Sequence, residues 1–127
     1  MDLFKAGAIV GAVGDVGLQT ASRLGIGNEG LERYFEENHP LESVALASGL
    51  TAMWSGLYGL VAGDQKSLHG FMAWSAAVDI LYRYEHPVLY PSLADYYAHN
   101  TPLASVLYNI ITAGLVWGVN KGSLLNS

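Results

Sequence analysis

The sequence predicts an all-α protein, a bundle of four transmembrane helices built from two parallel two-span repeats, each with a short interfacial helix. Three observations predict this fold: long stretches without charge, a low content of charged residues, and an internal repeat at a constant spacing. Of the 127 residues, 51% are apolar and only 13% are charged. Globular proteins average about 25% charged residues. Such a composition favours helices that lie in lipid.

The repeat consists of two 17-residue segments, 30–46 and 92–108, at a constant offset of 62. Seven positions are identical: Leu31/Leu93, Tyr34/Tyr96, Asn38/Asn100, Pro40/Pro102, Leu41/Leu103, Ser43/Ser105 and Val44/Val106. Repetition at a fixed period indicates that one structural unit occurs twice. We therefore expect a single membrane domain over residues 1–127, with one repeat over about 1–63 and a second over about 67–127.

The first repeat begins with a Gly- and Ala-rich span over about 3–22, which ends in residues 23–28, where Gly and Asn typically stop a helix. A short amphipathic helix follows, with Leu31, Tyr34 and Phe35 on one side and acids on the other. Such a helix is expected to lie flat at the membrane interface. Pro40 then opens a second span over about 41–63, of which the last 21 residues carry no charge.

The second repeat follows a tight turn at 64–66. A third span is expected over about 67–84, ending at Glu85-His86-Pro87, and a second short helix is expected from Tyr90 onward. The fourth span, about 102–120, lies in a run of 20 uncharged residues. A bilayer crossing needs about 20 apolar residues.

Four spans place both termini on one side of the membrane. The three lysines fall on that side and the three arginines on the other. Lys and Arg decide the orientation, and three such residues are expected on each side, so their number favours neither orientation. Only the position of Arg83 inside a helix favours cytoplasmic termini. The mean hydropathy of +0.26 also fits a small soluble helical bundle. The two uncharged runs lack the polar stripe of a soluble helix, which favours the membrane.

The candidate site is an intramembrane polar network formed by Asp15, Gln19, Asp79, Arg83 and Asn109. Steps of four place Gly7, Gly11, Asp15 and Gln19 on one face of the first span. The same spacing recurs in Asp79 and Arg83 of the third. Ionisable residues within a membrane normally face protein or water and have a partner. Arg83 is expected to pair with Asp79 or to reach Asp15. The network either locks the helices together or conducts protons or cations.

Other classes of function lack support in the sequence. There is no cysteine and therefore no disulfide or thiolate site. The net charge of −5 offers no basic surface for nucleic acid. The four histidines have no metal-ligand spacing, and no nucleotide-binding or catalytic motif occurs. We therefore expect no enzyme activity, no cofactor and no metal.

Two resemblances rest on particular residues. The fragments GAIVGAVGDVGLQ, YFEENHPLESVALASG and VDILYRYEHPVLYPSLADYY resemble small four-span membrane proteins of giant and other large DNA viruses, which implies a location in a virion's internal membrane. Gly14, Asp15 and Gln19 locally match the Gly-Asp-x-x-x-Gln motif of four-span mitochondrial and peroxisomal membrane proteins. The rest of the chain departs from that second family.

Two functions are expected from these observations. The first is a structural or scaffolding role in a membrane, in which an acidic, tyrosine-rich face contacts a capsid or membrane protein or a second copy of the chain. The alternative is a small ion channel or proton-coupled transporter that uses Asp15 and Asp79. In both, the lipid bilayer is the first partner and the protein is multi-pass.

Overall fold

The computed structural model describes residues 2–27, 29–89 and 93–121, and these residues form helices and connections with no strand among them. Six α-helices and one 3-10 turn follow one another: α1 (Leu3–Arg23), α2 (Glu29–Glu37), α3 (Pro40–Ala62), η1 (Gly63–Gln65), α4 (Leu68–Leu89), α5 (Ala94–His99) and α6 (Pro102–Asn120). The all-helical prediction is confirmed.

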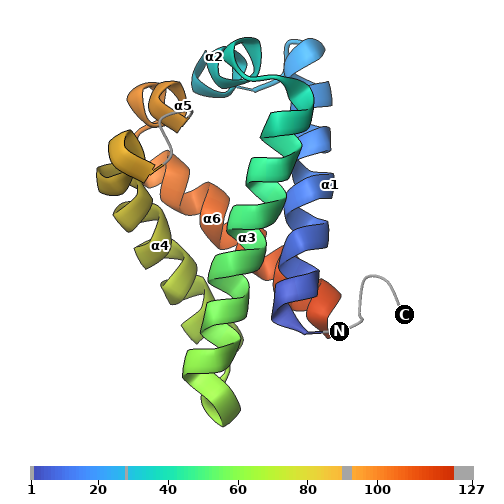
Figure 1. The fold of residues 1–127 in the computed structure, drawn as a ribbon, viewed down its shortest axis with the longest axis vertical. Helices are drawn as coiled ribbons and strands as arrows, with labels where there is room; N and C mark the ends of the chain where they lie inside the picture. Colours follow the sequence, from blue (N-terminus) through green and yellow to red (C-terminus); the bar gives the residue numbers. More distant parts are fainter. Residues whose placement is uncertain (1, 28, 90–92, 122–127) are drawn as a thin grey trace.

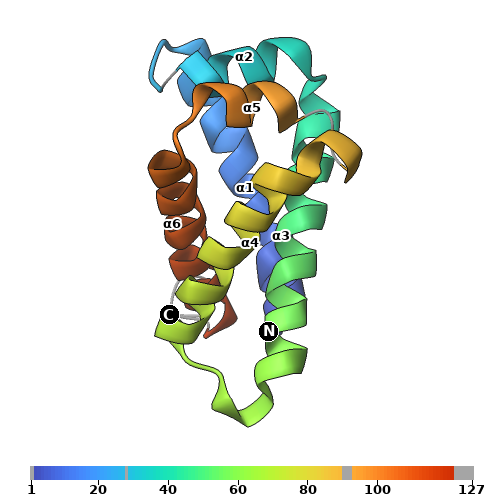
Figure 2. The ribbon, with the colours of Figure 1, turned by 90° about the vertical axis from the view of Figure 1, so that its left-hand side faces the viewer.

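The four long helices form a bundle that α2 and α5 cover at one end (Figures 1 and 2). α1 and α4 run toward that end, whereas α3 and α6 run away from it (Figure 1). α2 and α5 lie side by side, and the rings of Tyr34 and Tyr96 meet edge to face at 6.2 Å. The start of α1, the turn η1 and the end of α6 lie at the opposite end (Figure 2).

Local signals account for most helix ends. α1 ends where Gly25 adopts a φ of 79°, a conformation that only glycine takes at little cost. Pro40 and Pro102 occupy the first turns of α3 and α6, where a missing N–H costs nothing. His39 and Thr101 cap these two helices by accepting a hydrogen bond from a first-turn N–H.

One predicted boundary is wrong. The third span was expected to end at Glu85-His86-Pro87, but α4 continues through Pro87 to Leu89. Proline removes one backbone N–H and disfavours helical geometry in the residue before it, which is why a boundary was expected. Here it lies in the last turn, where only a short remaining stretch of helix depends on it. The second short helix was expected to start at Tyr90, and residues 90–92 lie outside the described part of the chain.

Small residues bring α1 and α3 into close contact. A Cβ added to Gly7 would lie 2.7 Å from the carbonyl oxygen of Thr51. A Cβ added to Gly11 would collide with the carbonyl oxygen of Ala47 and would lie 2.9 Å from Cα of Ser48. Close backbone approach at small residues is the usual packing of helices in membranes. The side chain of Ser48 strengthens the contact by donating to the Ala8 carbonyl at 2.9 Å.

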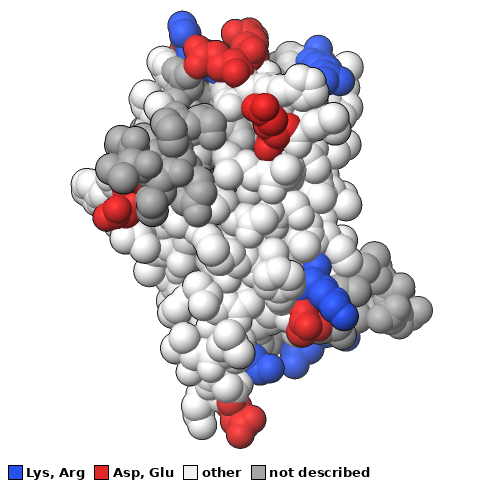
Figure 3. Space-filling model, in the orientation of Figure 1, with Lys and Arg blue, Asp and Glu red and all other residues white. Residues whose placement is uncertain are grey.

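The interior contains both an apolar core and a set of polar residues. An apolar core fills the end of the bundle near η1, around Phe71, Trp54 and Val116. Nine polar residues of the described part of the chain are also buried: Asp15, Gln19, Ser43, Thr51, Ser55, Ser75, Asp79, Asn100 and Ser105. Large apolar side chains are exposed instead, such as Leu60 at 82% and Ile111 at 60%. On the face in Figure 3, charged side chains gather toward the two ends and leave an uncharged band between them.

Two helices of the described residues are long and apolar enough to cross a membrane. They are Pro40–Gln65, which comprises α3 and η1, and α6, with mean hydropathies of 1.4 and 1.5 over their most apolar windows. Only 28% and 22% of these windows are buried inside the structure. The core helix of a soluble protein would be mostly buried, and these two are not.

The contact of α1 with α3 can be tested with two glycines of one helix. Gly11→Ala should lower the free energy of unfolding in detergent by about 1–3 kcal/mol, because the added methyl overpacks the contact with Ala47. Gly14→Ala is the control, since a Cβ there meets nothing within 4 Å. The control should be neutral or slightly stabilising, as alanine is the better helix former. Equal thermal stabilities of the two variants would contradict the packing.

Candidate functional site

The first buried carboxylate, Asp15, is held by α3 and by its own helix. The hydroxyl of Ser43 donates to both carboxylate oxygens, at 2.9 Å and 2.8 Å. The amide of Gln19, one turn along α1, donates to Oδ2 at 2.7 Å. The same amide nitrogen donates to the Pro40 carbonyl at 3.1 Å, at the start of α3. This first polar cluster therefore joins α1 to the first turn of α3.

The second buried carboxylate, Asp79, is held in the same way by α6. The hydroxyl of Ser105 donates to Oδ2 of Asp79 at 2.6 Å. The phenol of Tyr97, on α5, donates to Oδ1 at 3.3 Å. Asp79 is only 2% exposed, and Asp15 is 7% exposed, so both carboxylates depend on these donors rather than on water.

Arg83 completes the second polar cluster. Its guanidinium donates to the Tyr97 and Asn100 carbonyls at 3.1 Å and 2.9 Å. It also donates to the hydroxyl oxygen of Ser105 at 2.8 Å, and that hydroxyl in turn donates to Asp79. Ser105 therefore links the charge of Arg83 to that of Asp79. The guanidinium carbon also lies 5.1 Å from the centre of the Tyr97 ring, within cation–π range.

The two clusters share a serine–aspartate contact and an asparagine in the linker. Ser43 and Ser105 are repeated positions at the offset of 62, and each holds the aspartate of the preceding long helix. The linkers correspond too, because Asn38 and Asn100 each donate to the carbonyl four residues earlier at 2.8 Å. The clusters differ at two places: the phenol of Tyr97 has no counterpart, because Phe35 stands at the equivalent position, and the residue one turn beyond each aspartate differs. Gln19 stands in the first half and Arg83 in the second, and both bond to the backbone near the linker.

Three tyrosines of the short helices point inward. Tyr34 and Tyr97 are each only 6% exposed. Burial, followed by the nearby charge of Asp79, raises the pKa values of Tyr96 and Tyr97 far above the usual range. Burial also raises the pKa of Tyr34, although its hydrogen bond with Ser43 opposes the shift. All three phenols therefore stay neutral and can donate hydrogen bonds. Tyr90 lies outside the described residues.

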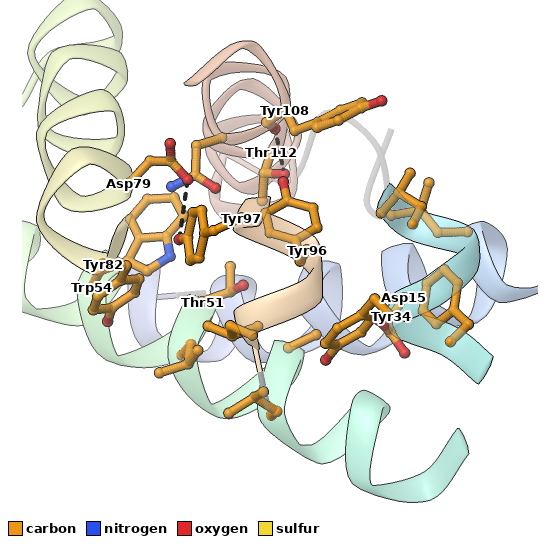
Figure 4. Close-up of a pocket in the computed structure, with 18 residues that line it drawn as sticks. Asp15, Tyr34, Thr51, Trp54, Asp79, Tyr82, Tyr96, Tyr97, Tyr108 and Thr112 are labelled. Carbon is orange, nitrogen blue, oxygen red and sulfur yellow. Dashed lines mark hydrogen bonds between the residues drawn. The ribbon is translucent and has the colours of Figure 1, made fainter. Parts of the chain in front are cut away.

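A cavity of about 180 Å³ lies between the two clusters. Both aspartates line it, and seven of its eighteen lining residues are aromatic. Figure 4 shows Asp79 with Tyr97 on one side and Asp15 with Tyr34 on the other, with Tyr96 between them. Residues of all four long helices line it, together with residues of α2 and α5.

The network predicted from sequence is only partly one cluster. The structure brings Asp15 and Asp79 to one cavity, which Asn109 also lines, and Asn109 bonds α6 to α4 through the Ser75 carbonyl at 3.0 Å. Gln19 and Arg83 point toward the linkers instead. Arg83 was expected to pair with Asp79 or reach Asp15, and in the structure it reaches Asp79 through the hydroxyl of Ser105.

The direct partners of the carboxylates were not predicted from the sequence. Ser43 and Ser105 were expected only as repeated positions, and Tyr97 was given no role. The signal was present in the repeat itself. A serine repeated in both halves bonds to each aspartate. Ser43 lies 28 residues after Asp15, and Ser105 lies 26 residues after Asp79.

Comparison with protein-family models, with curated proteins and with solved structures found no match.

Two serines of α3 test the role of the first cluster. Ser43→Ala should lower the free energy of unfolding by about 1–3 kcal/mol, because Asp15 stays buried with one donor fewer. Ser55→Ala is the control, since Ser55 is fully buried and its hydroxyl oxygen has no hydrogen-bond partner among the described residues. Removing that hydroxyl should be neutral or stabilising. Thermal unfolding in detergent measures both, and an equal loss in the two variants would show that burial alone matters.

Proposed function

We propose that the chain is an integral membrane protein in which all four long helices cross the bilayer as two parallel repeats. The observation that carries this proposal is the inverted distribution of polarity. Polar side chains are buried between the helices beside the apolar core, whereas many leucine, isoleucine and valine side chains face outward. Exposed apolar surface on this scale marks a contact with membrane or protein. Buried polar contacts are a usual way of joining helices within lipid.

The outward faces of α1 and α4 support their inclusion as spans. Their mean hydropathy is lowered by Asp15, Gln19 and Asp79, and these side chains are buried. Every exposed residue of α1 between 6 and 19 is apolar, and the same holds for α4 between 70 and 83. The 21 and 22 residues of these helices span about 30 Å, the thickness of a hydrocarbon core.

The contact between α2 and α5 is a second argument for four spans. If only α3 and α6 crossed, the chain would place α2 and α5 on opposite sides of the membrane. The rings of Tyr34 and Tyr96 meet between these two helices, which requires the same side. If all four long helices cross, α2 and α5 lie on the same side of the membrane and can make that contact.

The role that this geometry supports best is structural. Each carboxylate is held by hydrogen bonds from a neighbouring element, which is the arrangement of a helix lock. The acidic side chains of α2, among them Glu32 and Glu36, are exposed and are available to a protein partner. The acids, rather than the inward-facing tyrosines, would form that contact.

Single cysteines can test the topology, because the chain has none of its own. In oriented membranes, a maleimide reagent that cannot cross lipid should label Glu36→Cys and His99→Cys from the same side. Asp64→Cys should be labelled only from the other side. All three positions are exposed. Release of the protein by alkaline carbonate would contradict membrane integration altogether.

The alternative of two spans gives a different pattern. Glu36→Cys and His99→Cys would then react from opposite sides, and His99→Cys would share the side of Asp64→Cys. This outcome would refute the four-span proposal and leave membrane integration intact.

A second candidate function is proton or cation movement, and the shared cavity favours it. Both aspartates line a cavity between the two halves, where parallel-repeat transporters bind their substrates. In liposomes, Asp15→Asn and Asp79→Asn should then reduce proton or potassium flux at least tenfold. Asp64→Asn, at an exposed turn, should leave it unchanged. Wild-type flux equal to that of empty liposomes would refute transport, and a loss of thermal stability in the first two variants would leave the structural role.

A further inference from the structure

We propose that the cavity between Asp15 and Asp79 binds a small monovalent organic cation of the quaternary-ammonium class. The inference deepens the second candidate function, on which it rests, because it names the chemical class of the cation. Three features of the cavity carry it: an uncompensated carboxylate, an aromatic lining and a volume suited to one small molecule.

The charge argument centres on Asp15. All its hydrogen-bond donors, Ser43 and Gln19, are neutral, and among the described residues no salt bridge reaches it. Arg23, on the same helix, is exposed. Asp79 differs, because Ser105 links it to Arg83. The cavity therefore holds one negative charge that no cation among the described residues balances, and a bound cation would offset the cost of burying it.

The lining selects the type of cation. Tyr34, Tyr96 and Trp54 contribute ring surfaces, and aromatic faces attract cations that carry a weak hydration shell. Ca²⁺ and Mg²⁺ require about six or more oxygen ligands, several of them usually carboxylates. Among the described residues, no three His, Cys, Asp or Glu side chains converge on such a site. Rings together with one free charge fit a methylated ammonium group.

The volume sets the size. A cavity of about 180 Å³ has room for one small organic cation such as choline. Thr51 and Asn109 also line the cavity and offer polar groups to a hydroxyl substituent.

Calorimetric titration of the full-length protein in lipid nanodiscs tests the proposal, with choline and its uncharged isostere 3,3-dimethylbutan-1-ol as probes. Choline should bind and the isostere should not. Asp15→Asn should weaken choline binding about 30-fold or more, because it removes one partner of a buried charge pair. Asp64→Asn should leave it unchanged. Equal binding of the two probes, or unchanged binding to Asp15→Asn, would overturn the proposal.

Two further comparisons keep the result independent of folding. Tyr96→Leu should weaken choline binding, whereas Tyr96→Phe should retain it, because only the first removes the ring. Thermal unfolding without ligand must give equal midpoints for these two variants. Displacement of choline by millimolar sodium or potassium would show an inorganic-cation site and overturn the proposal.

The titration also separates this inference from transport. Choline binding without flux in liposomes would support the site and refute the transporter. Proton or potassium flux that depends on Asp15, with no choline binding, would leave the transporter standing and overturn the organic-cation site.

Discussion

A serine hydroxyl on one helix donates to a buried carboxylate on the helix before it, and this contact occurs once in each half. Ser43 holds Asp15 and Ser105 holds Asp79. In apolar surroundings an unbonded carboxylate is costly, so each bond fixes the register of its helix pair. The close approach at Gly11 follows the register set by Ser43. The same register positions the short helices that close the cavity.

The two halves share this contact and differ in charge. The residue one turn beyond the carboxylate is Gln19 in the first half and Arg83 in the second, and each bonds to the backbone that leads into the next long helix. A neutral amide and a guanidinium thus perform the same packing task. Only the guanidinium balances a carboxylate. The structural role and the proposed cation site are therefore compatible, because the first depends on what the halves share and the second on where they differ.

The helices could be predicted because their signals are local. Uncharged runs, first-turn prolines and Gly25 fix their positions to within a few residues. The end of α4 was missed, since a proline in a last turn reads like a proline after a helix. The partners of the aspartates were missed because Ser43 and Ser105 lie far from them along the chain. The tyrosines of the short helices were expected on a face that contacts partners. An amphipathic pattern shows which side of a helix is apolar, and it does not show what covers that side.

The sequence by itself determined the helical class, the placement of each aspartate within a long helix, and the correspondence between the two linkers. These properties follow from composition, spacing and short-range bonding. Only the tertiary structure decided which group satisfies each carboxylate, that both carboxylates reach one cavity, and that the short helices pack against each other. Those outcomes depend on how packed helices are rotated and shifted relative to one another. The spacing of residues along one helix shows which of them share a face, and it does not show which face of a neighbouring helix packs against them.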